Sequence, residues 1–429
     1  MAESSVEVVV QIDGEDILAG RLWSHRRRGA ESATFAYDAD YLAHPDAYAL
    51  DPALKLDGAP QQTAVGRAIF GAFSDCAPDR WGRRLLGRAE RRRVRREGGA
   101  ERSFGEIDYL LGVRDDLRQG ALRFRDPDSD TYRADEQSGI PHLVALPKLL
   151  GAAERLERDE ANDDELKMLL RGGSSLGGAR PKAHVLDQNG RVAIAKFPSA
   201  AGDEWDVIRW EGVALQLART AGISVPESTL HTIDGKAVLI VDRFDRAADV
   251  RIGYVSAMTM LEAGDGDTGS YLDIADVIKL HSHETGCDLR QLWRRIAFSI
   301  LISNTDDHLR NHGFLRTSSS GWTLSPAFDI NPDPRPGPKR LSTAVDYSDT
   351  AASIHRLIDV ADDFRLKPSD APQILDEVSS AVAGWRSAAE RVGLSHAAAD
   401  QMAPAFEHDQ AERAQELVDE WRPCLAHDR

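Results

Sequence analysis

The run RGGSSLGGARPK (residues 171–182) is the most informative stretch of the chain. Its four glycines allow backbone conformations that other residues resist. Two short apolar segments follow, residues 183–186 and 192–197, and the Asn-Gly pair between them predicts a β-hairpin. A glycine loop is therefore expected to stand on a hairpin that ends in a lysine, Lys196.

Beyond this hairpin the apolar pattern alternates between helix and strand and then becomes helical. The expected elements are a helix over residues 205–221, a buried strand over 237–241, an amphipathic helix from 289 to 301, a second hairpin over 313–324 and helices from about 353 to 423.

The residues before the glycine loop begin with a β-rich pattern. Apolar and polar residues alternate over residues 6–12, and the Asp-Gly pair that follows is a hairpin signal. A strand is expected over 120–124, and the run DPDSD (residues 126–130) has the composition of a linker. We therefore expect a β-rich amino-terminal module over residues 1–130.

The composition indicates a folded, acidic protein. Of its 429 residues, 42% are hydrophobic and 29% are charged. The net charge of −17 argues against a general nucleic-acid binder, because such a chain repels a polyanion. The sequence shows neither a signal peptide nor an apolar stretch of membrane-spanning length, so we expect a cytoplasmic protein without membrane contact.

Ten arginines between Arg80 and Arg102 are a local exception to the acidic balance. Most charge runs of this kind are solvated helix faces or loops, and we favour that interpretation. The alternative is a contact for DNA, RNA or an acidic partner.

Several groups occur in the order that phosphoryl transfer by a protein kinase requires. The reaction needs a phosphate cradle, a lysine on the phosphates, oxygen ligands for Mg²⁺ and a base for the attacking hydroxyl. The glycine loop comes first, then Lys196, then Glu211, which is placed to hold that lysine. Asp306 precedes Asn311 by five residues, the interval of the kinase catalytic loop, and Asp329 follows the second hairpin.

Each of these groups is weak evidence when taken alone. The glycine spacing matches neither the P-loop nor the usual kinase pattern, and Asp306 and Asn311 are residue types that also cap helices. The ordered combination is what favours a kinase.

The segments around these groups resemble the HipA family, the serine/threonine kinase toxins of bacterial type II toxin–antitoxin systems. The resemblance rests on residues 174–182 (SSLGGARPK), 195–198 (AKFP), 242–246 (DRFDR) and 304–311 (NTDDHLRN), with 20–23, 35–37, 41–42 and 77–84 near the amino end. It covers most of the chain. It implies an α+β, protein-kinase-like bilobal fold, with a small ATP-binding lobe over 140–250 and a mainly helical catalytic lobe over 251–429.

The resemblance also implies roles for single residues. It makes Asp306 the proton acceptor, Asn311 and Asp329 the Mg²⁺ ligands, and Lys196 the contact to the ATP phosphates. The other residues that it assigns to ATP binding are Leu176, Gly177, Gly178, Ala179 and Lys182 of the glycine loop, Asp242, Arg243 and Phe244 of the hinge that receives adenine, and His308.

The family further implies a self-inhibiting switch and a set of partners. Its members phosphorylate a serine of the glycine loop and so switch themselves off; Ser175 aligns best with that serine, and Ser174 is the second choice. The implied cofactors are ATP and Mg²⁺. The implied partners are a HipB-type helix-turn-helix antitoxin, operator DNA bound through the complex, and an aminoacyl-tRNA synthetase as substrate.

Two positions depart from the family pattern. Asp307 stands where a small residue is usual and adds a negative charge beside the base, and Arg310 replaces a lysine with a cation of different geometry. Activity is still expected.

Two other classes of function stay open at this point. A metallohydrolase would draw ligands from Asp306, Asp307, His308 and His312, and from the run HSHE (residues 281–284). A catalytically inactive kinase-fold interaction module would use the arginine run as its working surface.

Overall fold

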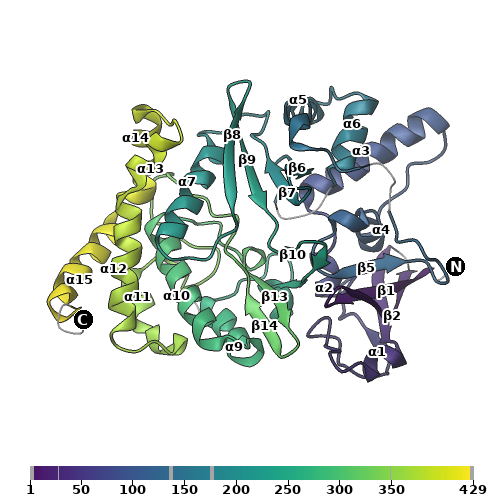
Figure 1. Cartoon of the computed structure of the whole chain (residues 1–429), viewed down its shortest axis with the longest axis horizontal. Helices are drawn as coiled ribbons and strands as arrows, with labels where there is room; N and C mark the ends of the chain where they lie inside the picture. The colour runs from purple at the N-terminus through teal and green to yellow at the C-terminus, as the bar shows by residue number, and fades with distance from the viewer. Residues whose placement is uncertain (1–3, 28, 135–138, 174–177, 348, 426–429) are drawn as a thin grey trace.

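The computed structural model describes residues 4–27, 29–134, 139–173, 178–347 and 349–425. Figure 1 shows an α+β molecule with a β-rich module at the amino end, a small lobe built on a second sheet, and a group of helices at the carboxyl end. This is the fold class that the sequence predicts.

The amino-terminal module is built on a five-stranded sheet in the order β4-β3-β2-β1-β5. Its strands are β1 (Ser4–Ile12), β2 (Glu15–Arg27), β3 (Ala30–Tyr37), β4 (Gln61–Gln62) and β5 (Leu122–Arg125), and its helices are α1 (Ala39–Ala43), α2 (Gly71–Asp75), α3 (Arg80–Glu97) and α4 (Glu106–Leu111). Asp13 and Gly14 join β1 to β2 with φ angles of 50° and 87°, so the predicted hairpin turn is confirmed.

The small lobe contains an antiparallel sheet in the order β6-β7-β9-β8. Its elements are α5 (Leu146–Glu157), α6 (Asp163–Arg171), β6 (Lys182–Leu186), β7 (Val192–Lys196), α7 (Val207–Thr220), β8 (Ser228–Ile233) and β9 (Lys236–Asp242). The hairpin expected after the glycine loop is β6–β7, and the expected helix and buried strand are α7 and β9.

The rest of the chain is mainly helical around α10, most of whose residues are buried. Its elements are β10 (Arg246–Ala247), β11 (Val250–Arg251), β12 (Gly253–Ser256), α8 (Ala257–Met260), α9 (Tyr271–His281), α10 (Thr285–Leu301), β13 (Gly313–Ser318), β14 (Gly321–Leu324), α11 (Ile354–Asp359), α12 (Asp370–Ala383), α13 (Trp385–Arg391), α14 (His396–Phe406) and α15 (Asp409–Leu425). The second predicted hairpin is β13–β14.

Most of the arginine run forms α3, as the helix interpretation predicts. One side of α3 buries Trp81 and Leu85 in the apolar cluster of the small lobe, together with residues of α5, α6 and the sheet. Several of its arginines form ion pairs, among them Arg83–Glu106, Arg92–Asp163 and Arg93–Glu90. Helix α3 thus connects the amino-terminal module to the small lobe.

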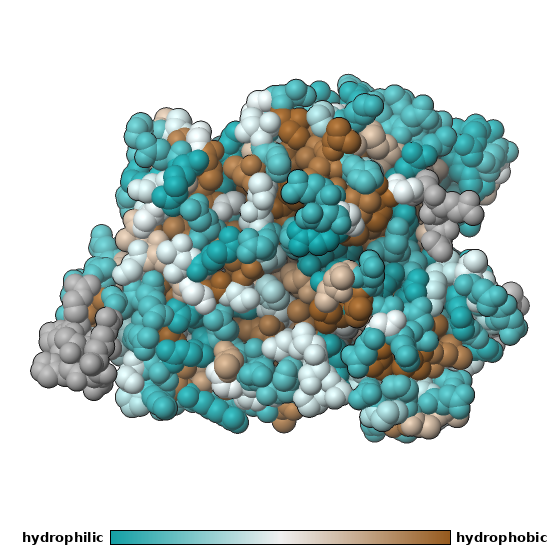
Figure 2. All heavy atoms as spheres, in the orientation of Figure 1, coloured by the Kyte–Doolittle hydropathy of each residue, from teal (hydrophilic) through white to brown (hydrophobic). Residues whose placement is uncertain are grey.

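Two apolar clusters hold the molecule together. The larger runs without interruption from the amino-terminal sheet through α7 and α10 to α15, and the smaller lies inside the small lobe around Trp81. The face seen in Figure 2 is mostly hydrophilic, with apolar residues in separate patches. Within the described ranges, we find no helix with the length and apolar character to cross a bilayer.

Candidate active site

Lys196, at the end of β7, lies between two carboxylates. Its Nζ donates to Glu211 Oε1 on α7 at 2.5 Å and to Asp329 Oδ1 at 2.9 Å. Burial acts to lower the pKa of Lys196, but the charges of Asp329 and Glu211 outweigh it and raise the pKa above its ordinary value. The lysine is therefore a fixed cation where the small lobe meets the residues after β14.

Asp329 is held in an uncommon conformation beside this lysine. Its φ of 57° is left-handed, a region that few residues other than glycine adopt and that often marks functional sites. Burial acts to raise its pKa, but Lys196 and Lys182 outweigh burial and lower the pKa. Asp329 is therefore an ionised carboxylate at neutral pH.

The loop from Asp306 to Asn311 is closed by hydrogen bonds to its own backbone. The Nδ2 of Asn311 donates to the carbonyl oxygen of Asp306 at 3.0 Å, and the backbone N–H of His308 donates to the same oxygen at 3.0 Å. The carboxylate of Asp306 stays exposed. Burial of part of this carboxyl and the nearby charge of Asp329 raise its pKa, against the opposing charge of His308.

The donor set of this loop fits Mg²⁺. Because the amide nitrogen of Asn311 is committed to Asp306, its Oδ1 is the atom that can face a metal ion, and the carboxylate of Asp329 is the second candidate ligand. Oxygen ligands of these two kinds are those that Mg²⁺ prefers.

Asp307 points away from this surface into the protein. Its carboxylate is 3.0 Å from His312 Nε2 and accepts a hydrogen bond of 2.5 Å from Tyr271. These partners, chiefly His312, lower its pKa although burial acts to raise it. The charge that the sequence places beside Asp306 is thus buried and paired, and these contacts hold the loop from the protein interior.

The alternative of a metallohydrolase finds little support. No three His, Cys, Asp or Glu side chains come together as a metal site in the described residues. His312 is engaged by Asp307, and His283 Nδ1 lies 2.9 Å from the carbonyl oxygen of Trp322.

The glycine loop is described only in part. Ser174, Ser175, Leu176 and Gly177 lie outside the described residues. Gly178 and Ala179 are exposed, and Gly178 has a φ of 95°. Lys182 begins β6 directly opposite Lys196 and is 4% exposed.

The hinge residues point in different directions. The carboxylate of Asp242 lies 3.6 Å from Arg191, and Phe244 packs on Phe328 at a ring separation of 5.4 Å. Arg243 is buried and turns its guanidinium towards the amino-terminal module, where it donates to the carbonyl oxygens of Leu117 and Arg118 at 2.7 and 3.0 Å. Its side chain therefore has a role that the sequence does not indicate.

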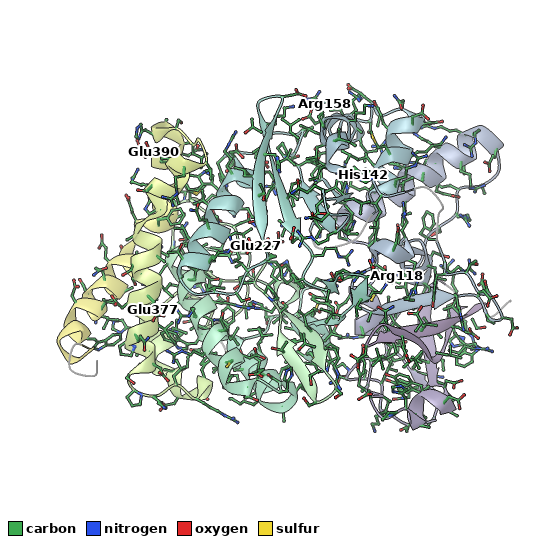
Figure 3. All side chains as sticks on the ribbon, in the orientation of Figure 1. Arg118, His142, Arg158, Glu227, Glu377 and Glu390 are labelled. Atoms are coloured by element: carbon green, nitrogen blue, oxygen red, sulfur yellow. The ribbon has the colours of Figure 1, made fainter. Side chains whose placement is uncertain are left out.

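Asp245 completes this contact, which we call the hinge clamp (Arg243, Asp245, Arg246 and the backbone of residues 117–120). Its Oδ2 lies 2.6 Å from Arg243 and 2.9 Å from Arg246, and it accepts a hydrogen bond of 2.7 Å from the N–H of Gly120. Arg118 marks this junction, between the amino-terminal sheet and the rest of the molecule, in Figure 3.

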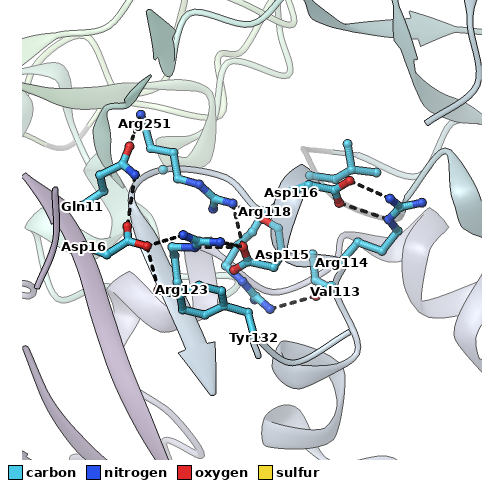
Figure 4. Close-up of polar contacts among 12 residues, drawn as sticks. Gln11, Asp16, Val113, Arg114, Asp115, Asp116, Arg118, Arg123, Tyr132 and Arg251 are labelled. Carbon is cyan, nitrogen blue, oxygen red and sulfur yellow. Dashed lines mark hydrogen bonds and ion pairs between the residues drawn. The ribbon is translucent and has the colours of Figure 1, made fainter. Parts of the chain in front are cut away.

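A second polar contact extends the junction along β5. Arg251 donates from Nη2 to Asp115 at 2.8 Å and from its backbone to Gln11 at 2.7 Å. Asp115 also pairs with Arg123 at 2.6 Å. Asp16 contacts both Arg123 and Gln11. Figure 4 shows this network. Charged groups from both sides thus fix the module against the hinge.

His184 contacts the hinge clamp, with its Nε2 3.3 Å from Nη1 of Arg243, and gives the clamp a pH dependence. Burial, and then the charge of Arg243, lower the pKa of His184 to about 3, against about 6.5 in an unfolded chain. Because the pKa of His184 is lower in the folded chain, the unfolded chain takes up the proton first as the pH falls. The stability that the neutral, buried His184 contributes is therefore complete above pH 6.5 and is lost as the pH falls towards 3. Over this range the free energy of unfolding falls by up to about 1.4 kcal/mol per pH unit.

We expect the free energy of unfolding in urea to fall more between pH 7 and pH 5 in the wild type than in His184→Asn. Asparagine offers an amide near the Nδ1 that lies 2.9 Å from the carbonyl oxygen of Gly172, but it does not titrate. Equal losses in both proteins would show that His184 is not the group responsible.

Fold and site together define a bilobal, kinase-like α+β protein. A family model described as the HipA-like C-terminal domain matches residues 174–385. Residues 174–385 are therefore similar to the HipA-like C-terminal domain.

Comparison with solved structures extends the fold to the whole chain. A chain in the Shewanella oneidensis MR-1 complex of HipA, HipB and operator DNA superimposes with a TM-score of 0.68 at 17% identity, over 97% of this chain and 99% of that chain. At this identity the likeness establishes the fold.

Two curated relatives carry kinase names. The Haemophilus influenzae protein named "Putative kinase" is 25% identical over 37% of this chain and 52% of its own length. The Sinorhizobium fredii protein named "Putative kinase Y4mE" is 25% identical over 53% of this chain and 54% of its own length. The chain spans about half the length of these relatives.

Proposed function

We propose that the chain is an ATP-dependent serine/threonine protein kinase of the HipA type that acts in the cytoplasm. The observation that carries this proposal is the position of Lys196, 2.5 Å from Glu211 and 2.9 Å from Asp329. A lysine fixed by a helix carboxylate beside a metal-binding aspartate is the arrangement that a kinase uses to hold ATP.

Each residue then has a defined task. Lys196, held by Glu211, binds the phosphates of ATP, and Asp242 to Phe244 provide the hinge for adenine. Asp329 and the Oδ1 of Asn311 hold Mg²⁺, which neutralises phosphate charge when bound. Asp306, exposed and with a raised pKa, accepts the proton of the substrate hydroxyl.

The resemblance to the HipA family also suggests a biological setting. We propose that the kinase is the toxin of a toxin–antitoxin pair, with a HipB-type antitoxin that carries the complex to operator DNA. The structural neighbour was solved with HipB and operator DNA, and the net charge of −17 suits a basic DNA-binding partner. An aminoacyl-tRNA synthetase is the substrate that family precedent favours.

Autophosphorylation of the glycine loop provides the first test. Incubation with Mg-ATP is expected to place phosphate on Ser175, or on Ser174, because both serines belong to the glycine-rich sequence that the family resemblance assigns to phosphate contact. Phosphopeptide mapping by mass spectrometry measures this. The switch is wrong if both serines stay unmodified while transfer that depends on Asp306 occurs, and the kinase proposal is wrong if the protein does not bind ATP.

A further inference from the structure

Lys182 is held from outside its own lobe. It is directly opposite Lys196 in the β6–β7 pair, so both side chains lie on the same face of the sheet. Its Nζ is 2.7 Å from Oδ2 of Asp79, and its carbonyl oxygen accepts a hydrogen bond of 2.9 Å from Nε1 of Trp81. Asp79 and Trp81 both belong to the start of α3, in the amino-terminal module.

Asp79 is a rigid partner for this lysine. While Oδ2 contacts Lys182, Oδ1 accepts the N–H of Gly82 at 2.7 Å and caps the first turn of α3. The helix is fixed in turn, because Trp81 and Leu85 are completely buried in the small-lobe cluster. The carboxylate therefore has little freedom to move.

The ammonium of Lys182 acts on the candidate active site. Its charge helps to lower the pKa of Asp329 and opposes the rise that burial causes in the pKa of Glu211. Lys182 thus lies within electrostatic reach of the same carboxylates that surround Lys196. The Asp79–Lys182 pair resembles the Glu211–Lys196 pair, because in each pair a carboxylate of a helix holds a lysine of the sheet.

We propose that Asp79 is a positioning residue that holds Lys182 where it contacts the phosphates of a bound nucleoside triphosphate. The amino-terminal module then contributes to the nucleotide site through the first turn of α3. This inference rests on the proposed kinase function, because it requires a nucleotide in the site.

The substitution Asp79→Asn separates positioning from folding. Asparagine is as good a helix cap as aspartate and has nearly the same shape, but it lacks the charge that holds Lys182. In the full chain with Mg²⁺ we expect Kd for ATP to rise about tenfold, the scale of a lost charged hydrogen bond, and Kd for adenosine to stay within about twofold. Isothermal titration calorimetry measures both.

Two further variants complete the experiment. Lys182→Met should weaken ATP binding, and adding Asp79→Asn to it should weaken ATP binding no further, because Asp79 acts only through that lysine. Because the double variant removes both charges, neither group is left buried without its partner. Asp38→Asn, the same change at the start of α1, should leave both dissociation constants unchanged.

A measurement on the wild type does not depend on whether the variant folds. Hydrogen exchange should slow at the amides of residues 80–86 when ATP binds, and slow less with adenosine, because only the triphosphate engages Lys182. Equal protection by both ligands would overturn the proposal.

The calorimetric outcomes are equally decisive. Equal weakening of ATP and adenosine by Asp79→Asn means a merely structural role, and unchanged or tighter ATP binding means that Asp79 does not place Lys182 on phosphate. If the wild type binds neither adenosine nor ATP, the kinase proposal itself fails, whatever Asp79 does. If it binds both with the same affinity, Lys182 adds nothing to phosphate binding, and the proposal for Asp79 fails while the kinase proposal stands.

Discussion

Replacement of Asp306 by asparagine is expected to slow phosphoryl transfer by about 10²–10⁴-fold, the usual contribution of a general base. The raised pKa of this carboxyl, caused by burial and the charge of Asp329, suits a proton acceptor. Asparagine cannot take up the proton. ATP binding should change little, because the loop is held by the carbonyl oxygen of Asp306 and not by its side chain.

Single-turnover transfer from γ-labelled ATP, with the Kd for ATP measured in parallel, tests this expectation. The matched control is Asp362→Asn, an exposed aspartate outside the site, which should keep full transfer. If Asp306→Asn retains transfer within about tenfold of the wild type, another group takes the proton and the assignment is wrong.

The set of candidate catalytic residues could be predicted from sequence because the chemistry restricts residue type and chain order together. Asp306 and Asn311 are five residues apart, so a single turn brings the Nδ2 of one to the carbonyl oxygen of the other. Lys196 and Glu211 lie on a consecutive strand and helix, 15 residues apart, and local folding is enough to bring them within reach. The structure places the carboxylate of Asp329 2.9 Å from Nζ of Lys196.

The contacts that fix the amino-terminal module could not be predicted in this way. Asp79 and Lys182 are 103 residues apart, and Asp245 and Gly120 are 125 apart. Such pairs form only when packing brings whole elements together, and no local pattern marks them. The run of residues 77–84 resembles the family, but the resemblance does not say what its aspartate touches.

The direction in which a side chain points could not be predicted from the sequence either. Arg243 belongs to the expected hinge, yet its guanidinium serves the hinge clamp, and Asp307 turns inward to His312. Both residues lie next to site residues, and adjacency in the chain does not fix a rotamer. The roles of Ser175, Leu176 and Gly177 stay predictions, because they lie outside the described residues.

Replacement of Asp245 by asparagine is expected to lower the free energy of unfolding by about 3–5 kcal/mol, the cost of breaking a buried ion pair on one side. The side chain of Asp245 is 3% exposed, and those of Arg243 and Arg246 are 1% and 13% exposed. Asparagine fills the same space but leaves two buried guanidinium groups without their carboxylate. Unfolding in urea followed by circular dichroism measures the change.

The pH dependence of this effect separates lost charge from altered packing. Burial acts to raise the pKa of Asp245, but Arg243 and Arg246 outweigh it and hold the pKa below its ordinary value. The stabilisation is therefore complete above about pH 4 and is lost as the pH falls further, so wild type and variant should converge in acid. Asp249→Asn, an exposed change in the same connection, should stay within about 0.5 kcal/mol. A loss below about 1 kcal/mol for Asp245→Asn, or one that persists unchanged at pH 3, would mean that the charge of Asp245 does not hold the module on the hinge.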